Sequence, residues 1–206
     1  QKGPWLAVWE RYCEAPRRYP NIPQQIRKCQ MPVFDLFERL DSTAGWPQWN
    51  DSQEESLRRD LKALAQVPMH EARKKILALH KHHRQRIDSV WAELGEAPLA
   101  MALNQLRIVA EITSYPLAGG TMEDLAAAYT TQGWQADSAV LRALDTVSTI
   151  EDSQAVTAAL RTVYQPWAET SAKYLQKIWN PAHTGPRLLS DQTKHDRQCV
   201  LFVDGL

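Results

Sequence analysis

Apolar residues recur at intervals of three and four along most of this chain, and this spacing predicts amphipathic α-helices. The expected helices cover residues 52–66, 69–94, 98–114, 121–133, 137–147 and 156–178, after shorter apolar stretches at 5–12 and 33–40. In the last helix Pro166 interrupts a seven-residue rhythm and predicts a kink. The pattern therefore predicts a mainly α fold, a multi-helix bundle over residues 1–180.

Capping and turn residues set the expected ends of these helices. Ser52 and Glu55 form a capping-box pattern that predicts a helix start, and Thr121 opens a second pattern of this kind. Residues 45–50 contain Gly, Pro and two Trp, and they predict a loop before the first of these starts. Gly133 predicts the end of the short helix that begins after Thr121.

The last seven residues, from Val200 to Leu206, depart from the helical pattern. Four apolar residues run into Asp204 and Gly205, which is how a buried parallel strand ends at the carboxyl edge of an α/β sheet. Active sites of open α/β sheets lie at this edge. Because residues 181–198 are polar and contain two Pro and one Gly, we expect a linker there. We interpret residues 199–206 as the first strand of an α/β catalytic domain that continues beyond this excerpt, since the chain also begins without Met.

The hydrophobic-Val-Asp-Gly-Leu ending resembles the opening strand of the alkaline-phosphatase superfamily, in which this strand carries the first metal-binding Asp. A large helical region precedes such a domain in the PglZ family of the bacteriophage-exclusion (BREX) defence systems. The segments Trp9–Cys13 and Arg17–Pro23 are similar to the pre-catalytic region of type B PglZ proteins. The chain thus resembles a PglZ helical region followed by the start of an alkaline-phosphatase-like domain at residues 199–206.

This resemblance implies that the full-length protein is a metal-dependent phosphatase or phosphodiesterase, with nucleic acid as one candidate substrate. It implies that Asp204 binds a divalent metal such as Zn or Mn, and that the nucleophile and the other Asp and His ligands follow Leu206. Because one carboxylate cannot hold a usable metal site, we expect this excerpt to bind no cofactor and to catalyse nothing.

The implied role is a non-catalytic scaffold that positions the catalytic domain and docks other subunits of an antiphage defence complex. The alternative is a helical adaptor with no hydrolase parent. Its C-terminal strand would complete an ordinary sheet or pair with another chain.

Composition adds few constraints on function. The 206 residues carry 24 Lys plus Arg and 24 Asp plus Glu, so net charge gives no argument for nucleic-acid or membrane binding. No apolar run approaches the roughly 20 residues of a membrane span. Three Cys without a CxxC pair favour reduced thiols and a cytoplasmic location. The sequence contains no Gly-rich phosphate loop and no GxSxG or HExxH motif, so these enzyme classes have no support.

The neutral total hides two blocks of opposite charge. Residues 58–88 carry nine Lys or Arg and three Asp or Glu, a net +6, and residues 111–170 carry two Arg and eight Asp or Glu, a net −6. A basic helix could contact nucleic-acid phosphates weakly through Lys74, Lys81 and Arg84. It could also lie in solvent, bind a protein partner or face the acidic helices of its own domain. We favour contact between the two blocks, which would leave little net field for DNA.

His80 and His83 share the apolar face of the helix expected over residues 69–94. Two imidazoles three residues apart could bind a metal, but Zn sites need three or four ligands and the sequence offers no third. We therefore favour a buried or half-buried histidine pair.

Two other pairs also have a chemical and a structural interpretation. Trp46 and Trp49 could anchor a partner or cover an edge of the core, and we favour coverage. His195 and Asp196 suggest acid–base chemistry, but adjacent residues of a polar linker rarely face one substrate.

Overall fold

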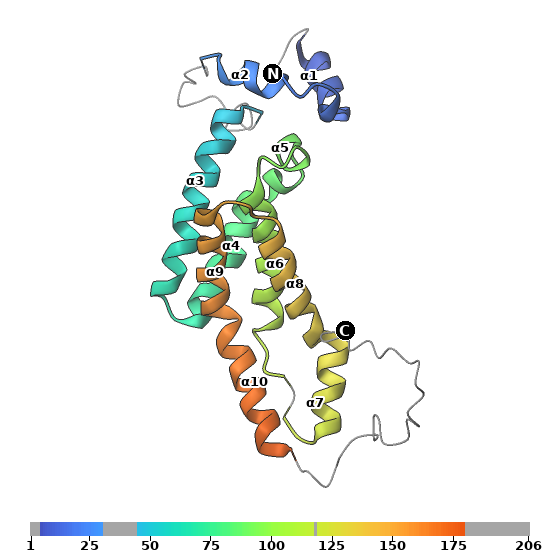
Figure 1. The fold of residues 1–206 in the computed structure, drawn as a ribbon, viewed down its shortest axis with the longest axis vertical. Coiled ribbons are helices and arrows are strands. Elements are labelled where there is room, and N and C mark those ends of the chain that lie inside the picture. Colours follow the sequence, from blue (N-terminus) through green and yellow to red (C-terminus); the bar gives the residue numbers. More distant parts are fainter. Residues whose placement is uncertain (1–4, 31–44, 118, 180–206) are drawn as a thin grey trace, which may run out of the picture.

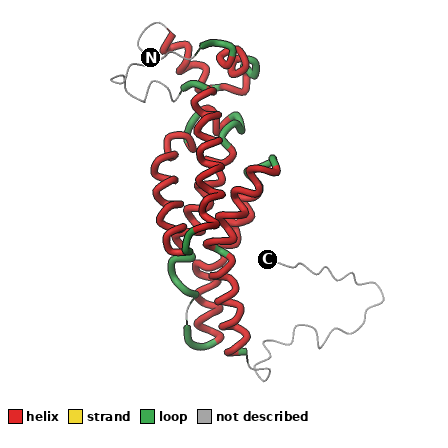
Figure 2. Tube along the Cα trace, turned by 90° about the vertical axis from the view of Figure 1, so that its left-hand side faces the viewer, coloured by secondary structure: helices red, strands yellow, loops and turns green. Residues whose placement is uncertain are grey.

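The computed structural model describes residues 5–30, 45–117 and 119–179, and all regular elements in these ranges are helical (Figure 1). Figure 2 shows no strand in the described chain, so the predicted mainly α bundle is confirmed. The helices are α1 (Trp5–Glu14), α2 (Ile22–Arg27), α3 (Pro47–Ala63), α4 (Met69–Ile87), α5 (Val90–Glu93), α6 (Pro98–Ile112), α7 (Met122–Ala128), α8 (Trp134–Asp145), α9 (Ile150–Val163) and α10 (Gln165–Ile178).

The apolar stretch at 33–40, the linker at 181–198 and the strand at 199–206 lie outside the described residues. Within the described ranges, no helix combines the length and the apolar character that a membrane crossing requires.

The bundle core is built around α6. The helix predicted over residues 98–114 places Leu99, Leu103 and Leu106 on one face at helical spacing. These side chains are fully buried, and the helix packs on both α4 and α8. The second predicted stripe, which includes Val156 and Val163 of α9, is also fully buried and belongs to a helix that packs on α3, α4 and α6. Because each such side chain contributes about 1.5–3 kcal/mol when removed from water, these two helices anchor the fold.

A narrower lobe extends from the core at the end opposite α1 and α2, and its two walls are α7 and α10 (Figure 1). Thr121 and Asp124 form the predicted capping box at the start of α7. The prediction that this helix closes at Gly133 was wrong, because a π-helical turn, Tyr129–Gly133, joins α7 directly to α8. A Cβ at Gly133 would lie 3.0 Å from the Tyr129 ring and 3.3 Å from Leu117, so glycine permits close packing there rather than ending the helix.

The position of the expected kink at Pro166 coincides with the boundary between α9 and α10. Helix α9 ends at Val163, Tyr164 interrupts the regular helix, and α10 begins at Gln165 with Pro166 in its first turn. Proline is tolerated there because an amide in the first turn has no partner within its own helix. Helix α10 continues from the end of α9 beyond the core and forms one wall of the lobe (Figure 1).

The start of α3 differs from the prediction. The helix begins at Pro47 and not at Ser52, so residues 47–50 are helical and the capping box is not formed. The Ser52 hydroxyl instead donates to the carbonyl oxygen of Trp49 at 2.7 Å. The additional turn includes Asn50, which is buried with Glu54 on one side of α3. Both residues contact Arg86 of α4, and Glu54 also contacts the start of α6.

The helix expected over residues 69–94 is divided in two. Helix α4 ends at Ile87, and α5 begins after Ser89, whose hydroxyl accepts the amide N–H of Ala92. Gly95 then adopts a φ of +77°, a conformation that glycine reaches without a steric cost. The break turns Trp91 into a small apolar cluster, where this side chain is fully buried.

Candidate functional site

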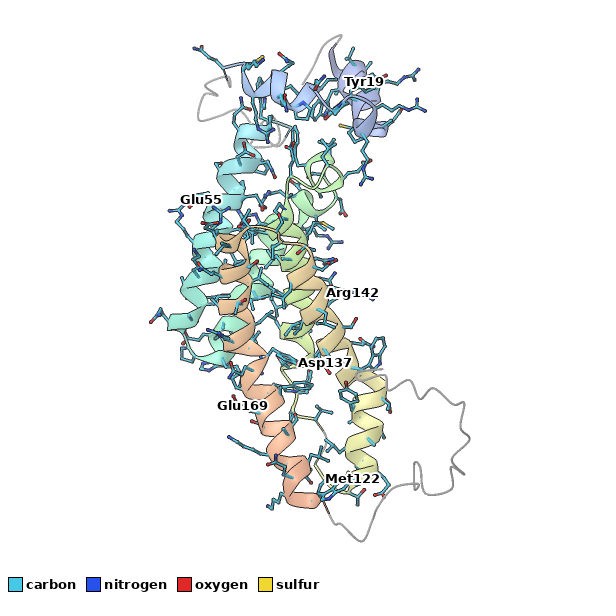
Figure 3. All side chains as sticks on the ribbon, viewed as in Figure 1. Tyr19, Glu55, Met122, Asp137, Arg142 and Glu169 are labelled. Atoms are coloured by element: carbon cyan, nitrogen blue, oxygen red, sulfur yellow. The ribbon has the colours of Figure 1, made fainter. Side chains whose placement is uncertain are left out.

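The walls of the lobe enclose a pocket of about 390 Å³ between α7 and α10. Leu117, Met122, Leu125 and Leu175 give it an apolar lining, and aromatic residues line its inner end. Among the described residues that line it, Asp137 alone carries a charge. Figure 3 shows Asp137 on the side of α8 that faces α10, and Met122 at the far end of the lobe. A preformed apolar pocket with few polar groups is the usual form of a ligand site.

Two tyrosine hydroxyls hold the Asp137 carboxylate in place. The Tyr129 hydroxyl donates to Oδ2 and the Tyr164 hydroxyl donates to Oδ1, each at 2.7 Å. The hydrogen bond to Asp137 raises the pKa of Tyr129, while burial, reinforced by the bond to Asp137, raises the pKa of Tyr164. Both phenols therefore stay protonated and act as donors to an ionised acceptor.

Asp137 forms no ion pair with any residue in the described ranges. The side chain is half-buried, so its negative charge faces the pocket with only neutral hydroxyl donors beside it. This combination sets Asp137 apart from the other partly buried carboxylates described below.

Trp167 forms the inner end of the pocket. It is 7% exposed, and its Nε1–H donates to the carbonyl oxygen of Tyr115 at 2.9 Å. Its ring lies 6.0 Å from that of Tyr164, at an interplanar angle of 38°. The wall is thus formed by a contacting aromatic pair in which Trp167 is buried and Tyr164 is half-buried.

A hydrogen-bonded tyrosine ties the two walls together at the far end. The Tyr174 hydroxyl of α10 donates to the carbonyl oxygen of Gly120 at 2.8 Å and accepts its amide N–H at 2.5 Å. A second pocket of about 470 Å³ lies on the other side of Leu117, and Arg73 is one of its lining residues. Burial lowers the pKa of Arg73, which donates to Thr113 Oγ1 at 3.1 Å.

Beside the first pocket, α8 carries an exposed apolar stripe. Trp134 is 47% exposed, Leu141 is 69% exposed and Leu144 is 38% exposed. These residues are seven and three positions apart and therefore lie on one side of the helix, as Asp137 does. Apolar residues grouped in this way on a surface helix indicate an interaction surface.

The most buried ionic group in the described chain lies in the core. Arg86 of α4 forms an ion pair with Glu54 of α3, and their side chains are 2% and 9% exposed. Arg86 also donates to Asn50 Oδ1 at 2.9 Å. Glu54 accepts the amide N–H groups of Leu99 at 2.8 Å and Ala100 at 3.3 Å. Since α6 has no side-chain cap of its own, Glu54 supplies the acceptor for free amides at its start.

The histidine pair is divided between two structural roles. His83 is 2% exposed, and its Nδ1 lies 3.2 Å from Nη1 of Arg86, so the ring accepts and must be neutral. Burial, aided by Arg86 and His82, lowers the pKa of His83 to about 4. His80 Nε2 lies 3.2 Å from Asn104 Oδ1. The favoured prediction of a buried or half-buried pair is confirmed, and no cluster of three potential metal ligands occurs in the described ranges.

The predicted contact between the charge blocks is present. Arg58 of the basic block pairs with Asp152 of the acidic block at 2.7 Å, and α4 packs on α9. Lys74, Lys81 and Arg84 take no part in this contact. They are exposed, lie on one side of α4 and form no ion pair with a described residue.

The remaining site residues predicted from the sequence form no further site in the described part of the chain. Trp46 and Trp49 are half-buried at the start of α3, which fits the predicted covering role. Asp204 and the pair His195-Asp196 lie outside the described residues.

The sequence pattern predicts Asp137 only as the start of a helix, whereas α8 begins at Trp134 and Asp137 lines the pocket. The available signal was an acidic residue among the apolar positions Trp134, Val140 and Leu141.

Comparisons of the chain with protein-family models, with curated proteins and with solved structures found no match.

Proposed function

We propose that this chain is the non-catalytic helical scaffold of a PglZ-like, metal-dependent phosphoric-ester hydrolase of a cytoplasmic antiphage defence system. The resemblance of residues 200–206, Trp9–Cys13 and Arg17–Pro23 to that family supports the proposal. In it, Asp204 contributes one ligand to a divalent metal such as Zn or Mn. The nucleophile and the other ligands belong to the catalytic domain of the parent protein.

The observation that carries the scaffold role is the exposed apolar stripe of α8, formed by Trp134, Leu141 and Leu144. The buried polar groups of the core, by contrast, connect helices to one another. The Glu54–Arg86 ion pair, for example, joins α3 to α4, and Glu54 also accepts an amide N–H of α6. We therefore assign docking of other subunits to α8 and assign no catalytic step to the helices.

The catalytic half of the proposal is tested by hydrolysis of bis(p-nitrophenyl) phosphate with Zn²⁺ or Mn²⁺ added to the purified 206-residue chain. The expected rate equals that of the Asp204→Ala variant and of metal alone. A metal-dependent rate that Asp204→Ala abolishes would show that this chain is itself catalytic.

The alternative function is a helical adaptor with no hydrolase parent, whose C-terminal strand pairs elsewhere. The gene sequence that follows Leu206 distinguishes the two. A Ser or Thr nucleophile with later Asp and His clusters supports the hydrolase, and a reading frame without them supports the adaptor.

A further inference from the structure

We propose that the pocket between α7 and α10 binds a small amphiphilic organic cation, in which an ammonium group is joined to an elongated apolar body. The pocket lies beside the docking stripe of α8, because Asp137 shares one side of that helix with the stripe. Trp134, Leu141 and Leu144 do not line the pocket, and the proposal does not depend on a hydrolase parent. Its evidence is the charge at one end of the pocket, the rings around that charge, and the apolar length beyond it.

The charge comes from Asp137. It is the one charged side chain that lines the pocket, and it forms no ion pair with any described residue. The hydroxyls of Tyr129 and Tyr164 use one acceptor position on each of its oxygens. A carboxylate has about four such positions, so Asp137 can still accept from an N–H group or attract a quaternary ammonium.

Aromatic rings surround the same end of the pocket. Tyr129, Tyr164 and Trp167 all line it, and the last two rings are 6.0 Å apart. The faces of such rings attract cations, by about 0.5–1 kcal/mol when exposed and about 2 kcal/mol when desolvated. Carboxylate and rings therefore favour a positive charge at one place, and both disfavour an anion.

The rest of the pocket suits an apolar chain. It extends along α10 from Tyr164 to Leu175 and along α7 to Met122, and eleven residues of helix span about 16 Å. Met122, Leu175 and Ala172 line the far end with apolar side chains. A ligand with its charge at Asp137 would direct its apolar body toward Met122, as the positions of the two labelled residues in Figure 3 indicate.

The probe is octyltrimethylammonium, titrated calorimetrically into the 206-residue chain below the concentration at which the probe forms micelles. Octanoate and 1-octanol are the anionic and neutral counterparts. We expect one bound cation per chain, with octanoate at least about tenfold weaker, which corresponds to 1.4 kcal/mol. No detectable binding of the cation, or equal binding of octanoate, overturns the proposal.

The variant Asp137→Asn removes the charge, and we expect the affinity for octyltrimethylammonium to fall about tenfold or more. Asp145→Asn is the matched control, because Asp145 is exposed on the same helix and does not line the pocket. The affinity of Asp145→Asn for octyltrimethylammonium should match that of the wild type. Equal losses in the two variants would indicate general attraction of cations to an acidic surface and would overturn the site.

A second variant keeps the test decisive if Asp137→Asn disturbs folding. Ala168 is half-buried and lines the pocket, so Ala168→Leu narrows the pocket while keeping a good helix former. We expect it to abolish binding of the cation while leaving the circular dichroism spectrum unchanged. Undiminished binding would place the cation elsewhere on the protein. Neither result depends on the phosphodiesterase assay, so the two proposals can fail separately.

Discussion

Glu54 and Asp137 are both partly or fully buried carboxylates, but their surroundings differ. Glu54 lies in the core, where it pairs with Arg86 and accepts two amide N–H groups of α6. Asp137 lies in the lobe, where two tyrosine hydroxyls are its hydrogen-bond donors and no described cation pairs with it. The first carboxylate is fully used in holding three helices together, whereas the second retains capacity for a ligand.

This difference separates a structural role from a binding role on physical grounds. A buried charge persists when partners within the fold compensate it, and removal of one partner is then strongly destabilising. A half-buried carboxylate whose described donors are neutral hydroxyls, such as Asp137, contributes less to folding than a buried ion pair and can still accept from a ligand. The core and the lobe should therefore respond differently to the same chemical change.

The largest expected effect is that of Glu54→Gln. It leaves the Arg86 charge uncompensated and weakens the capping of α6, so we expect the free energy of unfolding to fall by about 3 kcal/mol. Urea denaturation measures this, with Glu55→Gln, an exposed neighbour, as the control. A loss below about 1 kcal/mol would mean that the network is not structural.

The next largest effect concerns pH and His83. Its pKa is about 4 in the fold against an ordinary 6.5, so the unfolded chain takes up a proton first as the pH falls. The contribution of neutral His83 to the free energy of unfolding should be fully present above pH 7. The free energy of unfolding should then decline from pH 6.5 toward pH 4, by up to about 3 kcal/mol. The groups that oppose protonation are Arg86 and His82.

Thermal denaturation between pH 4 and pH 7 checks this decline. His83→Gln should flatten the dependence, because a neutral amide oxygen can still accept from Arg86. His82→Gln, at an exposed neighbour, should retain most of the dependence, because burial and Arg86 are the larger causes of the lowered pKa of His83. The same slope in His83→Gln and the wild type would assign the decline to other groups.

The amphipathic pattern predicted the parts of the fold that depend on local burial. The stripe of α6 from Leu99 and that of α9 from Val156 were found as expected, because periodicity directly reports which face is buried. The start of α3 was misplaced, since helix formation back to Pro47 is tied to distant partners. Asn50, which lies in that turn, accepts from Arg86 36 positions away, and no local pattern shows that contact.

The pocket was equally hidden from the sequence. Asp137 gains its role from Tyr164, which is 27 positions away and lies at the boundary between α9 and α10. Pro166 indicated an interruption of the helix near this boundary, but it did not indicate that Asp137 of α8 would lie opposite. An acidic residue within an otherwise apolar stripe was the one local sign of the site.

A smaller effect is expected for Thr121→Ala, which removes the cap of α7. We expect a local loss of about 1 kcal/mol, confined to the lobe because Thr121 makes its capping contact with Asp124 alone. Hydrogen exchange should accelerate in residues 122–133 and stay unchanged in α6. Thr131→Ala, in the exposed π-helical turn, is the control, and faster exchange throughout α6 would show that lobe and core unfold together.

The smallest effect on folding concerns the unpaired cations of α4. Changing Lys74, Lys81 and Arg84 together to Glu should alter stability by less than about 0.5 kcal/mol. Any affinity for duplex DNA should be weak, with a dissociation constant near 10⁻⁴ M or above at physiological salt. Fluorescence anisotropy at several salt concentrations measures it. A micromolar, salt-sensitive complex that the triple variant abolishes would make α4 a nucleic-acid surface.

The contrast between the two carboxylates is tested most directly by thermal unfolding of the wild type, Glu54→Gln and Asp137→Asn, each with and without octyltrimethylammonium. A ligand that binds only the fold raises the unfolding midpoint. We predict that Glu54→Gln lowers the midpoint but keeps the rise on ligand addition, whereas Asp137→Asn nearly keeps the midpoint and loses the rise. A rise retained in Asp137→Asn, or a midpoint unchanged by Glu54→Gln, would contradict the separation of structural core and binding lobe.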